Sequence, residues 1–142
     1  PGSPPLFPAD AGGRGGGGGM GLSRRQLGEA GEKAARRYLL SQGLAILECN
    51  YRCSLGEIDI VAREGGVLVF VEVRTRRGRR FGEAVESITP AKAARLRKLA
   101  LYYLQHRVGR ELPCRFDVVA IRMDSSGEKV AELVHHRGVE TG

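Results

Sequence analysis

The sequence has few cysteines and no apolar run long enough to cross a membrane. A transmembrane helix needs about 20 consecutive apolar residues. No charged segment followed by an apolar one, as in a secretory signal, opens the chain. The three cysteines, Cys49, Cys53 and Cys114, are odd in number and sparse, which is typical of reduced thiols rather than of a disulfide framework. We therefore expect a cytoplasmic protein that does not associate with membranes.

A zinc site is the alternative use of these three cysteines, with His106 as a fourth ligand. The four residues lack the paired Cys-x-x-Cys spacing of structural zinc sites, so isolated thiols are the simpler interpretation. We expect His106, His135 and His136 at the surface, because nothing near them in sequence would complete a catalytic triad.

Residues 1–22 have few apolar side chains and are rich in glycine and proline. Such a segment cannot bury enough apolar surface to offset the entropy lost on ordering, so we expect a disordered tail. One domain over residues 23–136 and a short C-terminal tail over 137–142 account for the rest of the chain. The net charge of +7 favours an anionic partner, of which nucleic acid is the commonest.

Helical and extended patterns alternate in the order α-β-β-β-α-β-β, which predicts an α/β domain. Ser23 and Gln26 form a capping box that opens a helix ending near Gln42. Thr89 and Pro90 open a second helix that runs to about residue 107. The extended segments cover residues 45–51, 57–63, 67–75, 114–122 and 129–135. A long helix between strands favours a mixed β-sheet with flanking helices.

Two glycines at 65 and 66 separate the second and third extended segments and predict a tight hairpin. With the glycines at its centre, Asp59 lies directly opposite Glu72. Like charges in opposed positions destabilise a hairpin, whereas a divalent cation bound by both carboxylates removes that cost. The register therefore predicts a metal site at Asp59 and Glu72.

The same register gives the hairpin one apolar face and one polar face. The polar face has Glu57 opposite Arg74, so the alternative interpretation is a solvated surface with an ion pair between these two residues. The expected core face carries Ile58, Ile60, Val67, Val69, Val71 and Val73.

Each predicted helix places one charged residue beside its apolar stripe. Glu32 shares a helical row with Leu39 and can reach the sheet, or it forms an ordinary i, i+4 pair with Arg36. Lys92 lies on the face of Leu96, where it either extends to solvent or points over the sheet toward a phosphate.

Taken together, these segments resemble the YraN family of uncharacterised, endonuclease-like bacterial proteins. The resemblance rests on residues 56–61 (GEIDIV) and 69–76 (VFVEVRTR), and it continues through residues 31–32, the start of the second helix at 92–96, and 115–119 (RFDVV). It covers nearly everything from about residue 28 to residue 121.

This resemblance implies a restriction-endonuclease-like fold, similar to the PD-(D/E)XK nucleases and to archaeal Holliday-junction resolvases. It makes Asp59 the motif aspartate, Glu72 the acidic residue of the E-x-K element, and Glu32 a supporting helix carboxylate, all three as ligands of Mg²⁺ or Mn²⁺. Arg74 fills the lysine position, which is a departure from the nuclease pattern. Arginine stays charged, so it can stabilise phosphate charge together with Lys92 but cannot act as a base.

We therefore expect a Mg²⁺-dependent, endonuclease-like phosphodiesterase that acts on nucleic acid, with DNA as the expected form. Selectivity for structure rather than sequence is expected, because a polar loop over residues 74–80 would hold backbone phosphates and has little aromatic content for base stacking. The arginines of that loop expected to bind nucleic acid are Arg76, Arg77, Arg79 and Arg80. For this loop, the alternative is a mobile, solvated charge run. For the whole domain, the alternatives are a non-catalytic nucleic-acid-binding module on the same fold, and a protein-interaction domain whose carboxylate face binds a basic partner. The resemblance also allows a homodimer.

Overall fold

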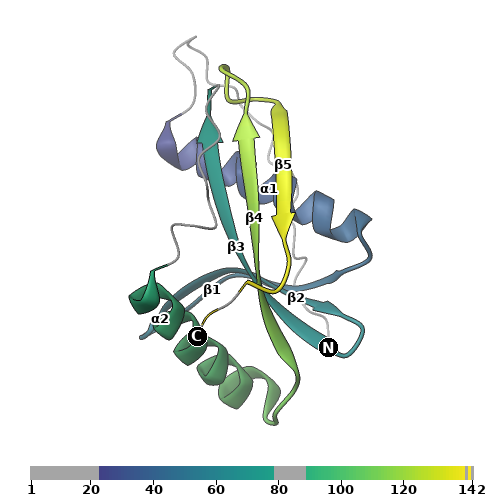
Figure 1. Ribbon diagram of the computed structural model, residues 1–142, viewed down its shortest axis with the longest axis vertical. Helices are drawn as coiled ribbons and strands as arrows, with labels where there is room; N and C mark the ends of the chain where they lie inside the picture. Colours follow the sequence, from purple (N-terminus) through teal and green to yellow (C-terminus); the bar gives the residue numbers. More distant parts are fainter. Residues whose placement is uncertain (1–22, 79–88, 140, 142) are drawn as a thin grey trace.

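The computed structural model describes residues 23–78, 89–139 and 141. Over these residues the elements follow the predicted order (Figure 1). They are α1 (Arg24–Ser41), β1 (Ala45–Cys53), β2 (Gly56–Glu64), β3 (Val67–Arg77), α2 (Pro90–Tyr103) with a π-helical extension η2 (Leu104–Val108), β4 (Cys114–Met123) and β5 (Val130–His136). The predicted tail over residues 1–22 lies outside the described part of the chain.

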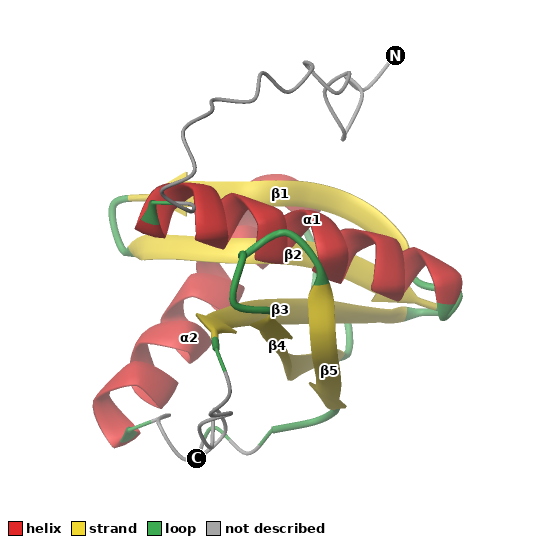
Figure 2. Cartoon of the chain, turned by 90° about the horizontal axis from the view of Figure 1, so that it is seen from above, coloured by secondary structure: helices red, strands yellow, loops and turns green. Residues whose placement is uncertain are grey.

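The strands form one mixed sheet in the order β1-β2-β3-β4-β5. Neighbouring strands are antiparallel except β3 and β4, which are parallel and are joined by the crossover that contains α2. In Figure 1, α1 passes behind β3, β4 and β5, and α2 lies in front of β1; Figure 2 shows the same arrangement from above. The predicted α/β class, with a mixed sheet and flanking helices, is confirmed.

Both helices begin where the sequence predicts. The Ser23 hydroxyl accepts a hydrogen bond from the backbone N–H of Gln26, and the Gln26 side chain accepts one from the backbone N–H of Ser23. This capping box satisfies two N–H groups that the first helical turn cannot. At α2, the Thr89 hydroxyl accepts a hydrogen bond from Lys92 N, and Pro90 follows in the first turn.

Both faces of the central strands are buried, which corrects the expectation of one core face and one polar face. Alternate residues of β2 and β3, such as Ile60 and Val71, pack against α1. The residues between them, such as Val61 and Phe70, pack against α2. A parallel crossover places its helix on the sheet, so strands beside it are covered on both sides. Ile58, predicted to share a face with Ile60, packs on the α2 side.

The hairpin register predicted from the two glycines is confirmed near the turn, from Glu64↔Val67 to Ile60↔Val71. Beyond Ile60 the described ladder between β2 and β3 ends. Glu57 pairs with Arg52 of β1, at 3.6 Å between the charged groups, and Arg74 pairs with Glu72. The alternative interpretation, an ion pair between Glu57 and Arg74, is therefore wrong.

The predicted polar loop begins later than expected, because β3 continues through Arg77. Strand β3 pairs with β4 as far as Arg77↔Met123. The local sequence around Arg77 does not indicate that β4 is its neighbour. Arg76 and Arg77 are exposed strand residues. The remaining two arginines of the expected loop, Arg79 and Arg80, lie outside the described residues.

Candidate metal and phosphate site

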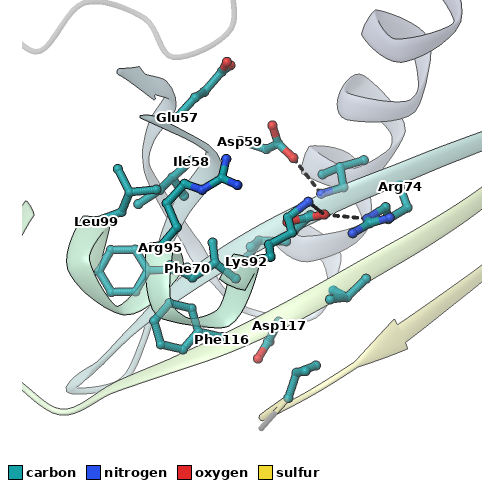
Figure 3. Close-up of a pocket in the computed structure, with 16 residues that line it drawn as sticks. Glu57, Ile58, Asp59, Phe70, Arg74, Lys92, Arg95, Leu99, Phe116 and Asp117 are labelled. Atoms are coloured by element: carbon teal, nitrogen blue, oxygen red, sulfur yellow. Dashed lines mark hydrogen bonds and ion pairs between the residues drawn. The ribbon is translucent and has the colours of Figure 1, made fainter. Parts of the chain in front are cut away.

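The candidate site forms where β2 and β3 separate. Asp59 Oδ2 accepts a hydrogen bond of 2.8 Å from the backbone N–H of Val73 (Figure 3). Because a strand N–H without a partner is costly when it is shielded from water, the Asp59 side chain replaces the missing backbone partner. The bond fixes the Asp59 carboxyl beside β3, next to the residues on either side of Val73.

Asp59 lies among other carboxylates in a half-buried position. Burial raises the pKa of Asp59 to about 6. The hydrogen bond from Val73 is the next largest effect and lowers this pKa, whereas the charges of Glu32, Glu72 and Glu57 raise it further. Burial also raises the pKa of Glu32, against a hydrogen bond with Asn50 that lowers it. Burial and the neighbouring carboxylates therefore disfavour the ionised forms of both side chains.

Glu72 has the opposite environment. Its Oε2 atom contacts Lys92 Nζ at 2.7 Å and also Arg74 Nε (Figure 3). The Glu72 side chain is only 13% exposed, so both ion pairs are partly shielded from water. Lys92 therefore points to the sheet, which is one of the two orientations predicted for it. Glu72 thus receives one cation from α2 and one from β3.

These groups line a cavity of about 440 Å³ between the sheet and α2. Its floor is apolar and includes Phe70, Leu99 and Phe116. Its charged lining includes Glu57, Asp59, Glu72, Arg74, Lys92 and Arg95. An apolar floor with a few convergent charged groups is the usual character of a binding site.

Glu32 approaches from the other side of the sheet. It lines a second cavity, of about 360 Å³, together with Val73, which is common to both cavities. A Cβ atom on the neighbouring Gly31 would lie 1.9 Å from Thr75 Oγ1, so only glycine allows α1 to approach β3 this closely. The absence of a side chain at Gly31 thus brings Glu32 within electrostatic range of Asp59.

The three predicted metal ligands do not form a ready-made cluster. Among the residues that the structure describes, no group of three or more His, Cys, Asp or Glu side chains is placed to hold a metal ion. Asp59 and Glu72 nevertheless fit a hard cation, because Mg²⁺ is usually held by one or two carboxylates and several waters. A cation bound there would offset the burial and the neighbouring carboxylate charges that raise the pKa of Asp59.

The sequence patterns missed two features near the cavity. Arg95, one turn after Lys92 on α2, lines it; the i, i+3 spacing could have indicated this. Asp117 is a fully buried carboxyl on β4 whose oxygens bind Arg115, His135 and the backbone N–H of Gly138.

His135 corrects the expectation of three surface histidines. Its side chain is 4% exposed, with Nε2 at 2.8 Å from Asp117 and Nδ1 at 3.1 Å from the Tyr38 hydroxyl. His106 is exposed as predicted and stacks on Tyr102. Sequence periodicity could not predict that His135 is buried, because its partners Tyr38 and Asp117 are far from it in the sequence and meet it only in the folded protein.

The zinc alternative conflicts with the positions of the cysteines. Cys49 packs against the core on the α1 side, whereas Cys53 and Cys114 pack on the α2 side. One ion cannot contact thiols on opposite faces of a sheet at the short distances that zinc requires.

No described helix is both long and apolar enough to cross a membrane. Comparison with known proteins matches residues 31–121 to the model of a family described as "Uncharacterised protein family UPF0102". These residues include both strand motifs, Glu32 and Lys92.

Several bacterial proteins of that name are similar over most of the chain. One from Moorella thermoacetica is 52% identical over 112 residues, which cover 79% of this chain and 92% of the relative. One from Symbiobacterium thermophilum is 47% identical over 112 residues, which cover 79% of this chain and 95% of the relative. One from Desulfitobacterium hafniense strain Y51 is 45% identical over 121 residues, which cover 84% of this chain and 100% of the relative. The chain therefore belongs to the UPF0102 family, also called YraN.

Proposed function

We propose that this protein is a metal-dependent phosphodiesterase of the endonuclease type that acts on nucleic acid, with DNA as the expected substrate. One observation carries the proposal. A desolvated carboxyl, Asp59, faces a cavity whose other charged groups include Glu72 and three cations from β3 and α2. A perturbed carboxyl beside convergent cations in a cavity is typical of a catalytic site rather than of a solvated surface.

Asp59 and Glu72 would hold Mg²⁺ or Mn²⁺ on the cavity side, with Glu32 contributing its charge from the α1 side. When bound, such an ion polarises a phosphate oxygen and lowers the pKa of a bound water. The bond to Val73 supports this role because it fixes the direction of the Asp59 carboxyl without using its second oxygen.

Arg74 and Lys92 orient Glu72 and place positive charge where negative charge would develop on a phosphate. Both are held by the same Glu72 oxygen, so their positions are set before any ligand enters. Arg74 remains protonated, so in this proposal it stabilises charge and takes no part in proton transfer.

The exposed arginines at the end of β3, Arg76 and Arg77, support the nucleic-acid partner. They extend the positive charge of the site along the strand that carries Glu72. Contacts of this kind bind backbone phosphates without reading bases, so we propose selectivity for structure over sequence.

The test is cleavage of a labelled panel of branched, flapped, single-stranded and double-stranded DNA with Mg²⁺ or Mn²⁺. Wild type should cleave at least one member, and Asp59→Asn/Glu72→Gln should cleave none. Glu132→Gln, on the exposed part of β5, is the matched control and should cleave like wild type. Metal-independent cleavage, or equal cleavage by the double variant, would contradict the proposal.

A second candidate is a nucleic-acid-binding module without catalysis. The presence of arginine at position 74 favours it, as does the double ion pair that already neutralises Glu72. It predicts salt-sensitive binding of the same panel with no cleavage in either metal.

A further inference from the structure

Arg95 is the cation of the cavity whose position the strand motifs do not explain. It projects from α2 toward the side of the cavity where Glu57 and Asp59 lie (Figure 3). A Cβ atom at Gly56 would be 3.5 Å from Arg95 Cδ and 3.4 Å from Leu99 Cδ1. These are ordinary van der Waals distances, so the start of β2 lies directly beneath the stem of Arg95, and glycine is favoured at position 56 by its φ of +143°.

The three cations that the described residues contribute to the cavity are not equivalent. Lys92 and Arg74 are both bound to Glu72 Oε2. Arg95 has no ion pair with any residue in the described ranges 23–78 and 89–139, although it lies in the same cavity. A phosphate could recruit Lys92 or Arg74 only by competing with Glu72, whereas Arg95 is available without that competition.

We propose that Arg95 binds a backbone phosphate of the nucleic acid in this cavity, through paired N–H donors to the two non-bridging oxygens. This inference rests on the proposed nucleic-acid function. A guanidinium presents parallel donors that match a phosphodiester, and its fixed charge needs no protonation step. Arg95 is then a binding residue, and Arg74 and Lys92 mainly orient Glu72.

Binding without turnover provides the first test. Fluorescence anisotropy in EDTA would measure the affinity of a fluorescein-labelled single-stranded 20-mer and of a flap for wild type, Arg95→Gln and Arg97→Gln. Arg97 is exposed on the same helix and does not line the cavity, so its variant loses equal charge. We expect Arg95→Gln to bind about 10-fold more weakly. Its slope of log affinity against log salt should fall by about 0.7 to 0.9, the value of one phosphate contact.

Equal affinities and equal salt slopes for the Arg95→Gln and Arg97→Gln variants would overturn the assignment. Arg95→Lys adds a geometric test, because it keeps the charge and loses the paired donors. It should bind with an affinity between those of wild type and Arg95→Gln. The melting temperature of Arg95→Gln should equal that of wild type, since Arg95 has no described ion pair to lose.

A dinucleotide, d(TpT), separates Arg95 from the arginines outside the cavity. Its titration into ¹⁵N-labelled protein should shift the Nε–Hε signal of Arg95, identified by its loss in Arg95→Gln. Shifts confined to Arg76 or Arg77 would contradict the proposal and leave nucleic-acid binding intact.

The inference and the proposed function can fail separately. Binding that depends on Arg95 without metal-dependent cleavage would remove the phosphodiesterase and keep the phosphate site. Metal-dependent cleavage with an unchanged KM in Arg95→Gln would keep the phosphodiesterase and remove the phosphate site at Arg95. No binding of any probe by wild type would overturn both.

Discussion

The carboxyl group of Asp59 is hydrogen-bonded to the backbone of Val73, 2.8 Å away, where the ladder between β2 and β3 ends. One oxygen of a carboxyl that is central to the candidate site therefore has a structural task. Because an amide oxygen can accept the same bond, the charge of Asp59 can be removed while this contact is kept. That separation makes the charge experimentally accessible.

Asp59→Asn should stabilise the protein at neutral pH. The folded-state pKa of about 6 lies above the ordinary value of 3.8, so folding opposes ionisation of Asp59. Its favourable contribution to stability is complete below about pH 4 and is lost as the pH rises through 6, by up to about 3 kcal/mol. Urea denaturation from pH 4 to 8 should show equal stabilities at pH 4 and a more stable variant at pH 8.

Asp124→Asn is the control with the opposite sign. The hydrogen bond from the Ser126 hydroxyl, followed in effect by backbone N–H groups of the turn, lowers the pKa of Asp124. Its contribution is therefore present at neutral pH and lost in acid, so the variant should be less stable than wild type at pH 8. A stability difference for Asp59→Asn that does not change with pH would contradict the proposed cause.

Stabilisation by a divalent cation should grow with pH. Protons compete with a metal for Asp59, so the rise in melting temperature caused by Mg²⁺ or Mn²⁺ should be larger at pH 8 than at pH 5. At about 100 times its dissociation constant, a ligand stabilises by about 2.7 kcal/mol. Thermal denaturation would measure this, and Asp59→Asn/Glu72→Gln should lose the shift at every pH.

Glu72 and Lys92 should be strongly coupled. Glu72→Gln leaves Lys92 and Arg74 close together without their shared counter-ion, and we expect a loss of about 1–3 kcal/mol in the free energy of unfolding. Lys92→Met should then be less harmful in the Glu72→Gln background than in wild type. A double-mutant cycle by urea denaturation measures the coupling; additive effects would show that the ion pair contributes nothing to stability.

Gly31→Ala should displace α1 from β3. The added methyl group would overlap Thr75, and overpacking of this kind costs about 1–3 kcal/mol. Gly28→Ala is the matched control, because no atom lies within 4 Å of a Cβ there, and it should be neutral or stabilising. Thr75→Ser should partly rescue Gly31→Ala by removing one of the overlapping atoms, which thermal denaturation would detect.

Local features of the sequence predicted most of the fold. The capping residues located α1 and α2, and the two glycines fixed the hairpin register that brings Asp59 toward β3. These signals act over a few residues, so one sequence contains them in full. The order of elements followed from periodicity, and the mixed sheet followed from that order.

Features that depend on distant segments were missed or misjudged. The parallel pairing of β3 with β4 extends β3 through Arg77, where a loop was expected. The packing of α2 buries the face that the register alone made polar. His135 meets Asp117 and Tyr38 only because β5, β4 and α1 assemble in three dimensions. None of these contacts leaves a periodic trace in sequence.

The crossover between β3 and β4 also sets an order of arrival during folding. Asp59 and Glu72 belong to strands joined by a two-residue turn, which closes quickly because little chain entropy is lost. Lys92 and Arg95 belong to the crossover, whose parallel pairing is non-local and slow to form. Arg74 lies on β3 and accompanies Glu72, so we expect the hairpin to bring the two carboxylates and Arg74 together before Lys92 and Arg95 arrive. A chain that folds in the presence of Mg²⁺ can then bind the ion at those carboxylates before α2 docks.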